Sequence, residues 1–176
     1  MQTGPVLLRP CTPADLDAVR DIYAHAVAQG TGTFELEVPA ADEMARRHRD
    51  VLSKGLPWLV AEQDSQLLGY AYATPFRPRP AYRFSVEDSI YLHPAAQGRG
   101  VGRLLLAELV SRCQAAGARQ MLAVIGDSAN QASIGLHRAL GFEPSGTLQS
   151  VGWKFGRWLD VVLMQRPLGA GAGSPP

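Results

Sequence analysis

Apolar residues recur along this chain with two different spacings, which predict its helices and its strands. Apolar residues three and four positions apart form one stripe on a helix, whereas short continuous runs are typical of buried strands. Helical spacing occurs at 12–29, 101–116 and 130–140, and each segment is followed by a glycine, a common helix stop. The stripes of the first two consist of Leu16, Val19, Ile22, Tyr23 and Ala26, and of Val101, Leu105, Leu109 and Cys113.

A fourth helix, polar and ending before Gly55, is predicted at 41–54. Two apolar runs within 58–76 flank Asp64 and Ser65, which is the pattern of a β-hairpin. Further strands are predicted at 6–9, 86–92, 119–126, 147–155 and 158–166. Because strands surround a strand–helix–strand–helix centre, we expect an α/β fold with a mixed sheet and a pair of helices on each face.

Composition narrows the class of protein. With 176 residues, a net charge of +1 and 19% charged residues, the chain lacks the basic excess that nucleic acid requires. We expect one domain over 1–168 and a disordered Gly- and Pro-rich tail at 169–176, with no membrane span or export signal. Cys11 and Cys113 are far apart, so neither a disulfide framework nor a metal site is expected, which fits a reducing cytoplasm.

The stretch "QGRGVGRLLL", residues 97–106, places three glycines directly before an apolar helix. Free amides and the helix dipole at such a start favour an anion, and glycines let a phosphate approach the backbone. Arg99 and Arg103 add positive charge. A P-loop is excluded because no Gly-Lys-Ser/Thr follows, whereas a plain glycine-rich connector stays open. A dinucleotide fingerprint needs glycine where Arg103 stands, although Asp127 at the end of a later strand leaves that alternative open.

The segment "QGRGVG" also matches the Gln/Arg-x-x-Gly-x-Gly/Ala loop that holds the pyrophosphate of coenzyme A. On this motif the chain resembles the GNAT superfamily of N-acetyltransferases. Residues 76–102, 123–142 and 151–166 look, in the same order and spacing, like its phosphinothricin and methionine sulfone (methionine sulfoximine) branch. The resemblance implies a central mixed, mostly antiparallel β-sheet flanked by about four helices, acetyl-CoA as co-substrate, and a homodimer.

The resemblance also implies a set of cofactor-binding residues. They are Ile90, Tyr91, Leu92, Gln97, Gly98, Arg99, Gly100, Val101, Gly102, Arg103, Asn130 and Ser133. Asn130, Ser133 and His137 fall on one face of their helix, so all three are expected to line the coenzyme arm. The backbone amides of Tyr91 and Leu92 are expected to stabilise the oxyanion that forms during acyl transfer.

Two residues are expected to be catalytic. A carboxylate within an apolar strand is costly unless it is paired or functional, and alternation places Glu87 with Ser89 and Tyr91 on one face. The resemblance implies that Glu87 is the general base, acting directly or through water, whereas we expect Asp88 to be an edge carboxylate facing solvent. His137 stands where many relatives carry a tyrosine that protonates the sulfur, and a purely structural histidine is the alternative.

Substrate contacts are expected from two further segments. Arginine suits carboxylates, so Arg77 and Arg79 with Tyr82 are expected to orient the carboxylate of an amino acid. The resemblance adds Pro80 and Ala81, and places Phe34 in the substrate loop. Phe34 or Trp153, which replaces a tyrosine frequent in the branch, would cover the substrate side chain.

We therefore expect a cytoplasmic N-acetyltransferase that transfers the acetyl group of acetyl-CoA directly to the α-amine of a small amino acid or analogue. No cysteine is placed to act as a nucleophile, since Cys113 falls on a buried helix face. Two alternatives stay open. One is an enzyme for another amine, such as a protein N-terminus or a polyamine, although the basic "FRPRPAYR" disfavours polyamines. The other is an acetyl-CoA-binding sensor or interaction module without catalysis.

Overall fold

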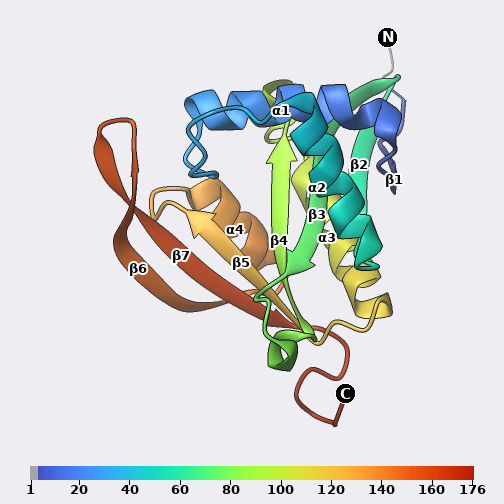
Figure 1. Ribbon diagram of the computed structural model, residues 1–176, viewed down its shortest axis with the longest axis vertical. Helices are drawn as coiled ribbons and strands as arrows, with labels where there is room; N and C mark the ends of the chain where they lie inside the picture. The colour runs from blue at the N-terminus through green and yellow to red at the C-terminus, as the bar shows by residue number, and fades with distance from the viewer. Residues whose placement is uncertain (1–3) are drawn as a thin grey trace.

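The computed structural model describes residues 4–176, which fold around one seven-stranded sheet (Figure 1). The strands are β1 Leu7–Pro10, β2 Trp58–Gln63, β3 Gln66–Pro75, β4 Ser85–Leu92, β5 Gln120–Gly126, β6 Glu143–Lys154 and β7 Arg157–Pro167. Their order in the sheet is β1-β2-β3-β4-β5-β7-β6, and the β4–β5 pair alone is parallel. The predicted mixed, mostly antiparallel sheet is confirmed.

Four helices cover this sheet, as the sequence predicted. They are α1 Leu16–Gln29, α2 Ala41–Ser53, α3 Val101–Ala115 and α4 Gln131–Ala139, with 3₁₀ turns at Pro13–Asp15, Pro80–Tyr82 and Pro94–Ala96. The first helix begins as a 3₁₀ turn, because Asp15 accepts hydrogen bonds from the Thr12 backbone N–H and hydroxyl. Arg9 of β1 donates two further hydrogen bonds to the same carboxylate and so ties the helix start to the sheet.

Alternation along the strands sends side chains into two separate cores. In β2, Trp58 and Val60 pack under α1 and α2, whereas Leu59 and Ala61 pack under α3. The α1–α2 core is rich in aromatic side chains, and Trp58 stacks on Tyr72 with 4.2 Å between ring centroids. The α3–α4 core is mainly aliphatic. The predicted pair of helices on each face is therefore confirmed.

The sheet opens between its two parallel strands. β4 and β5 are paired from Ser85 to Asp88 and from Gln120 to Ala123, but β4 continues to Leu92 and β5 to Gly126. Their last residues have no ladder partner across this gap, so the central sheet is interrupted beneath α4 and the end of α1 (Figure 1). Polar backbone groups at such an interruption are available to a ligand.

The C-terminal segment packs back on the body of the molecule. Leu168 belongs to the α3–α4 core, and the Arg119 guanidinium donates hydrogen bonds to the carbonyls of Ser174 and Pro175. The single domain over 1–168 and the disorder of 169–176 stay predictions. No helix within residues 4–176 has both the length and the apolar character needed to cross a bilayer.

Candidate active site

The glycine turn has the backbone conformation that its sequence suggested. Gly98 and Gly100 have φ values of +71° and +79°, a region that side chains with a Cβ rarely adopt, and Gly100 is the N-cap of α3. Gly102 is needed for a different reason, because a Cβ there would lie 3.3 Å from side-chain carbons of Leu92 and Leu136. The first two glycines shape the turn, and the third lets α3 approach β4 and α4.

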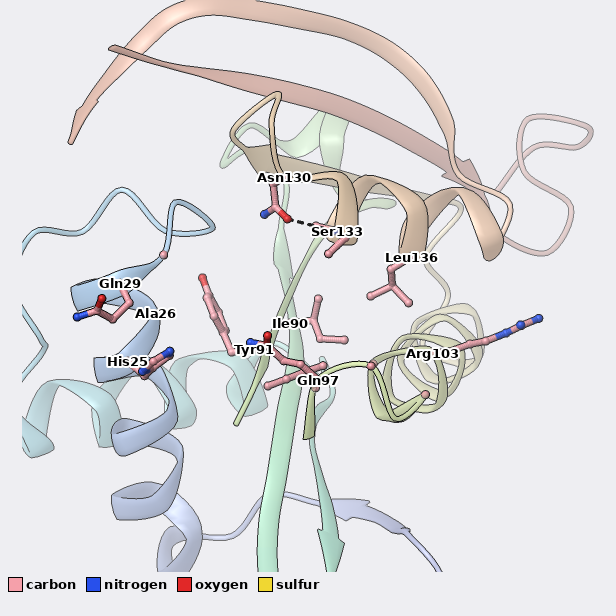
Figure 2. A pocket seen from close by; sticks show the side chains of 16 residues that line it. His25, Ala26, Gln29, Ile90, Tyr91, Gln97, Arg103, Asn130, Ser133 and Leu136 are labelled. Atoms are coloured by element: carbon pink, nitrogen blue, oxygen red, sulfur yellow. Dashed lines mark hydrogen bonds between the residues drawn. The ribbon is translucent and has the colours of Figure 1, made fainter. Parts of the chain in front are cut away.

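A cavity of about 670 Å³ begins at this turn and runs between α1 and α4 over the end of β4 (Figure 2). Ten of the predicted cofactor-binding residues line it: Ile90, Tyr91, Leu92, Gln97, Gly98, Gly100, Gly102, Arg103, Asn130 and Ser133. Two others lie elsewhere. The side chain of Val101 is buried in the core, and Arg99 donates a 2.6 Å hydrogen bond to Gln63.

The first helix supplies a wall of this cavity that the sequence analysis missed. His25, Ala26, Gln29 and Gly30 come from the end of α1 and face the turn across the cavity (Figure 2). His25 lies exposed at the rim of the cavity. The contribution of α1 follows from its packing on β3 and β4, although its end at Gln29 and the start of β4 at Ser85 lie far apart in sequence.

A second cavity, of about 250 Å³, lies where β4 and β5 separate. It shares Ala26, Ile90, Tyr91, Asn130 and Ser133 with the first, so the two cavities adjoin. Its polar wall contains Glu87, Asp88, Ser89 and His137, and Gly32 and Thr33 of the α1–α2 loop close it. The predicted common face of Asn130, Ser133 and His137 is confirmed, since all three line this cavity.

Glu87 is half-buried in the second cavity and has no hydrogen-bonded partner within residues 4–176. Burial raises the pKa of this carboxyl, and the neighbouring charge of Asp88 raises it further, whereas Arg77 lowers it. A carboxylate with a raised pKa and a free oxygen is suited to accept a proton near neutral pH.

Asp88 does not face solvent, so that expectation was wrong. Its carboxylate is buried and lies 2.9 Å from Nε2 of His137, and the side chains of both are at most 3% exposed. Alternation placed Asp88 on the correct face, but β4 is a central strand and that face is covered by α4. The other oxygen, Oδ1, is buried without a partner in the described structure.

His137 uses both ring nitrogens within the protein. Nδ1 lies 2.8 Å from the carbonyl of Ser133, which is an acceptor, so Nδ1 carries the proton of this contact. Burial lowers the pKa of His137, but the hydrogen bond and charge of Asp88 outweigh it, and the pKa is raised overall. The pair therefore favours an imidazolium held by a carboxylate.

Asn130 caps α4. Its Oδ1 accepts a hydrogen bond from the backbone N–H of Ser133, and its Nδ2 donates to the carbonyl of Gly126. The cap fixes the first turn of α4 against the end of β5, beside both cavities.

The residues predicted to bind substrate lie outside both cavities. Arg77, Arg79, Pro80, Ala81 and Tyr82 form an exposed segment before β4, in which the guanidinium of Arg77 lies 4.3 Å from the ring centroid of Phe76. The positive charge of Arg77 nevertheless lowers the pKa of Glu87. Phe34 packs between Gly126 and Gly152, and Trp153 points outward from β6.

The interrupted sheet, the glycine turn at a helix start and the two adjoining cavities are typical of a protein that binds a phosphate-bearing carrier beside a second, smaller molecule. The chain belongs to the acetyltransferase (GNAT) family, whose sequence model matches residues 18–142. The fold and the family resemblance expected from the sequence are thereby confirmed.

Named relatives are similar over most of the chain. A phosphinothricin N-acetyltransferase of Alcaligenes faecalis is 60% identical over 158 residues, which are 89% of this chain and 80% of that protein. An L-methionine sulfoximine/L-methionine sulfone acetyltransferase of Salmonella typhimurium is 38% identical over 92% of this chain and 94% of its own. A phosphinothricin acetyltransferase of Sinorhizobium meliloti, solved in complex with AcCoA, superposes with a TM-score of 0.94 at 50% identity, covering 97% of this chain and 92% of its own.

Proposed function

We propose that the protein is an acetyl-CoA-dependent N-acetyltransferase that acts on the α-amine of a small amino acid or analogue of the phosphinothricin, methionine sulfone or methionine sulfoximine type. The observation that carries the proposal is the pair of adjoining cavities, with bare amides at the far end of one and Glu87 in the other. The names of the relatives support the same reaction and substrate class.

Acetyl-CoA fits the first cavity by its chemistry. Its pyrophosphate would be held by the amides of the glycine turn with Arg103 beside it, because a helix start with φ-positive glycines presents several N–H groups to one anion. The pantetheine arm would follow β4 and α4, whose residues line both cavities. The thioester would then lie at the junction of the cavities, next to the carboxylate.

In the proposed reaction Glu87 accepts the first proton. An α-ammonium group has no lone pair, so it must lose a proton before its nitrogen attacks the thioester carbonyl. The N–C bond forms and the C–S bond breaks; a second proton of the former ammonium group ends on the departing sulfur, and the third stays on the amide nitrogen. The products are the N-acetylated amino acid, the free thiol of coenzyme A and the one proton that Glu87 passes to solvent.

For His137 we propose the structural alternative rather than the acid. Delivery of a proton to sulfur from Nε2 would break its hydrogen bond with Asp88, and Nδ1 is held by the Ser133 carbonyl. The buried pair instead fixes the position of α4, which carries Asn130 and Ser133 along the coenzyme arm.

A panel of amines tests the function. Release of the coenzyme A thiol is measured with methionine sulfone, methionine sulfoximine, phosphinothricin, spermidine and a peptide with a free N-terminus. The proposal expects turnover of the first three and little of the others. Turnover confined to spermidine or the peptide would contradict the substrate class. Acetyl-CoA binding without turnover of any amine would support the alternative of a sensor module.

We also propose a homodimer formed through the β6–β7 aromatic surface, defined as Trp153, Phe155 and Trp158. These side chains are 55%, 54% and 61% exposed, and Leu148 and Val151 extend the surface along the same hairpin. Such a patch is a typical association surface. Sedimentation of the parent protein should give a mass twice the 18.9 kDa of one chain, whereas the W153S/W158S variant should give the mass of a single chain. A monomeric parent protein would contradict this assembly.

The two cysteines support a reducing cytoplasm as the place of action. Cys11 and Cys113 are both buried and free, so the fold uses no disulfide between them.

A further inference from the structure

Lys154 is a buried charged residue that forms no salt bridge among residues 4–176, although the charge of Glu35 partly offsets the effect of burial on its pKa. The chain has only two lysines, and Lys54 is an exposed partner of Asp50 on α2. Lys154, at the end of β6, is 3% exposed, and its Nζ donates two 2.8 Å hydrogen bonds to the carbonyls of Gly30 and Thr33. Burial lowers the pKa of its ammonium group. Burying a charge costs free energy unless the charge is hydrogen-bonded, so the role of Lys154 depends on the two carbonyls that it binds.

Those carbonyls belong to the loop that closes the site. Gly30 lines the larger cavity, and Gly32 and Thr33 line the smaller one together with Glu87. The hydroxyl of Thr33 is further held at 2.8 Å by that of Tyr23 on α1. Lys154 of β6 and Tyr23 of α1 therefore both hold this loop beside the β4–β5 opening.

Phe34 anchors the next residue of the same loop on the same strands. A Cβ at Gly126 or Gly152 would lie less than 3.0 Å from ring carbons of Phe34, so both positions are open only to glycine while the ring is there. The ring is thus wedged between the end of β5 and β6. Phe34 and Lys154 together fasten residues 30–34 to strands that lie more than 90 residues away in sequence.

We propose that Lys154 is a positioning residue for the acceptor substrate: it holds the loop at residues 30–34, with Phe34 as a second anchor, so that Gly32 and Thr33 line the smaller cavity together with Glu87. The role rests on the proposed function. It assigns the loop mainly to the acceptor, because Gly30 alone of residues 30–34 lines the cofactor cavity, most of which comes from β4, the glycine turn and α4.

The test compares Lys154→Met with Lys54→Met. Methionine keeps the length of the side chain but removes the donors, so Gly30 and Thr33 lose their partner. We expect kcat/KM for the acceptor to fall about tenfold or more, as for a lost charged hydrogen bond, while the Kd of acetyl-CoA changes less than about threefold. Lys54→Met should have the same kcat/KM for the acceptor and the same Kd for acetyl-CoA as the parent. A folded Lys154→Met with unchanged acceptor kinetics, or with acetyl-CoA binding lost in parallel, would overturn the role.

Gly152→Ala provides a second route if Lys154→Met does not fold. The φ of Gly152 is not positive, so the added methyl displaces Phe34 without straining the backbone. We again expect kcat/KM for the acceptor to fall while the Kd of acetyl-CoA stays close to that of the parent. Amine labelling read by mass spectrometry adds a measure independent of turnover: Lys154 should be protected in the parent and labelled in Gly152→Ala. Continued protection with parent kinetics would overturn the role. A parent inactive on every amine would instead refute the proposed function, whatever the labelling shows.

Discussion

The two halves of the site are built in different ways. One continuous segment, from Ile90 to Arg103, supplies the strand, turn and helix start of the cofactor half. The acceptor half combines the α1–α2 loop, the separated ends of β4 and β5, α4, and a lysine from β6. The comparison teaches that the phosphate-binding turn is a local property of the chain, whereas acceptor recognition depends on tertiary contacts. Substitutions should therefore affect one half and spare the other.

The largest difference between effects on catalysis and on acetyl-CoA binding is expected for Glu87→Gln. Glutamine keeps the shape of the side chain but accepts no proton, so kcat should fall by roughly 100-fold or more. Thiol release under saturating acetyl-CoA and methionine sulfone measures it. Glu37→Gln, at an exposed loop position, is the matched control and should retain parent activity.

The same residue predicts a pH dependence. The pKa of Glu87 is raised, so the acid limb of kcat/KM should lie above the pH at which an ordinary glutamate titrates, and activity should decline as pH falls through it. A pH–rate profile of the parent checks the position of this limb. An acid limb at the ordinary glutamate value would show that Glu87 is not the titrating base.

Gly100→Ala is expected to do the opposite, weakening acetyl-CoA binding while leaving catalysis at saturation almost unchanged. An alanine at φ +79° is strained by about 1–2 kcal/mol, and relief of that strain moves the amides away from their common anion. The KM for acetyl-CoA should rise about tenfold, with kcat at saturation within about twofold of the parent. Gly55→Ala imposes the same strain at φ +70° beyond the end of α2, remote from both cavities. An equal effect of both substitutions would mean that the turn has no special part in binding.

The smallest effect concerns stability. Asp88→Asn removes the charge that raises the pKa of His137 but keeps a hydrogen-bond acceptor, so it should cost about 1 kcal/mol in the free energy of unfolding below pH 6. A histidine whose pKa is raised on folding contributes fully below its unfolded pKa of about 6.5, and the contribution is lost as pH rises through the folded pKa. Urea titrations at pH 6 and pH 9 should therefore show a smaller difference between parent and variant at pH 9. A difference that grows with pH would exclude the imidazolium–carboxylate pair.

The sequence predicted the cofactor half because its signals are local. The helix stripe from Val101 to Cys113, the glycine spacing and the preceding strand all lie within one short segment, and ten of twelve predicted residues line the cavity. The helix pairs and the sheet were likewise predictable from alternation, as Trp58 and Leu59 show by entering opposite cores.

The sequence predicted Glu87 and His137 in the acceptor half, but the rest of this half escaped prediction because its residues come from distant segments. Periodicity assigned Asp88 to a face, but only the position of β4 within the sheet shows that α4 covers that face. Phe34 was expected to cover a substrate, yet it fills space left by Gly126 and Gly152, which no local pattern connects to it. The sequence did contain a signal for Lys154. Nearly all basic residues of the chain are arginines, and Lys154 is one of only two lysines.

Calorimetric titration of acetyl-CoA into the parent, Glu87→Gln and Gly100→Ala in one series tests most directly whether the halves are separate. The parent and Glu87→Gln should bind with the same Kd, and Gly100→Ala should bind about tenfold more weakly. No heat with the parent, or equal weakening in both variants, would contradict a carrier site built by the glycine turn and independent of the carboxylate.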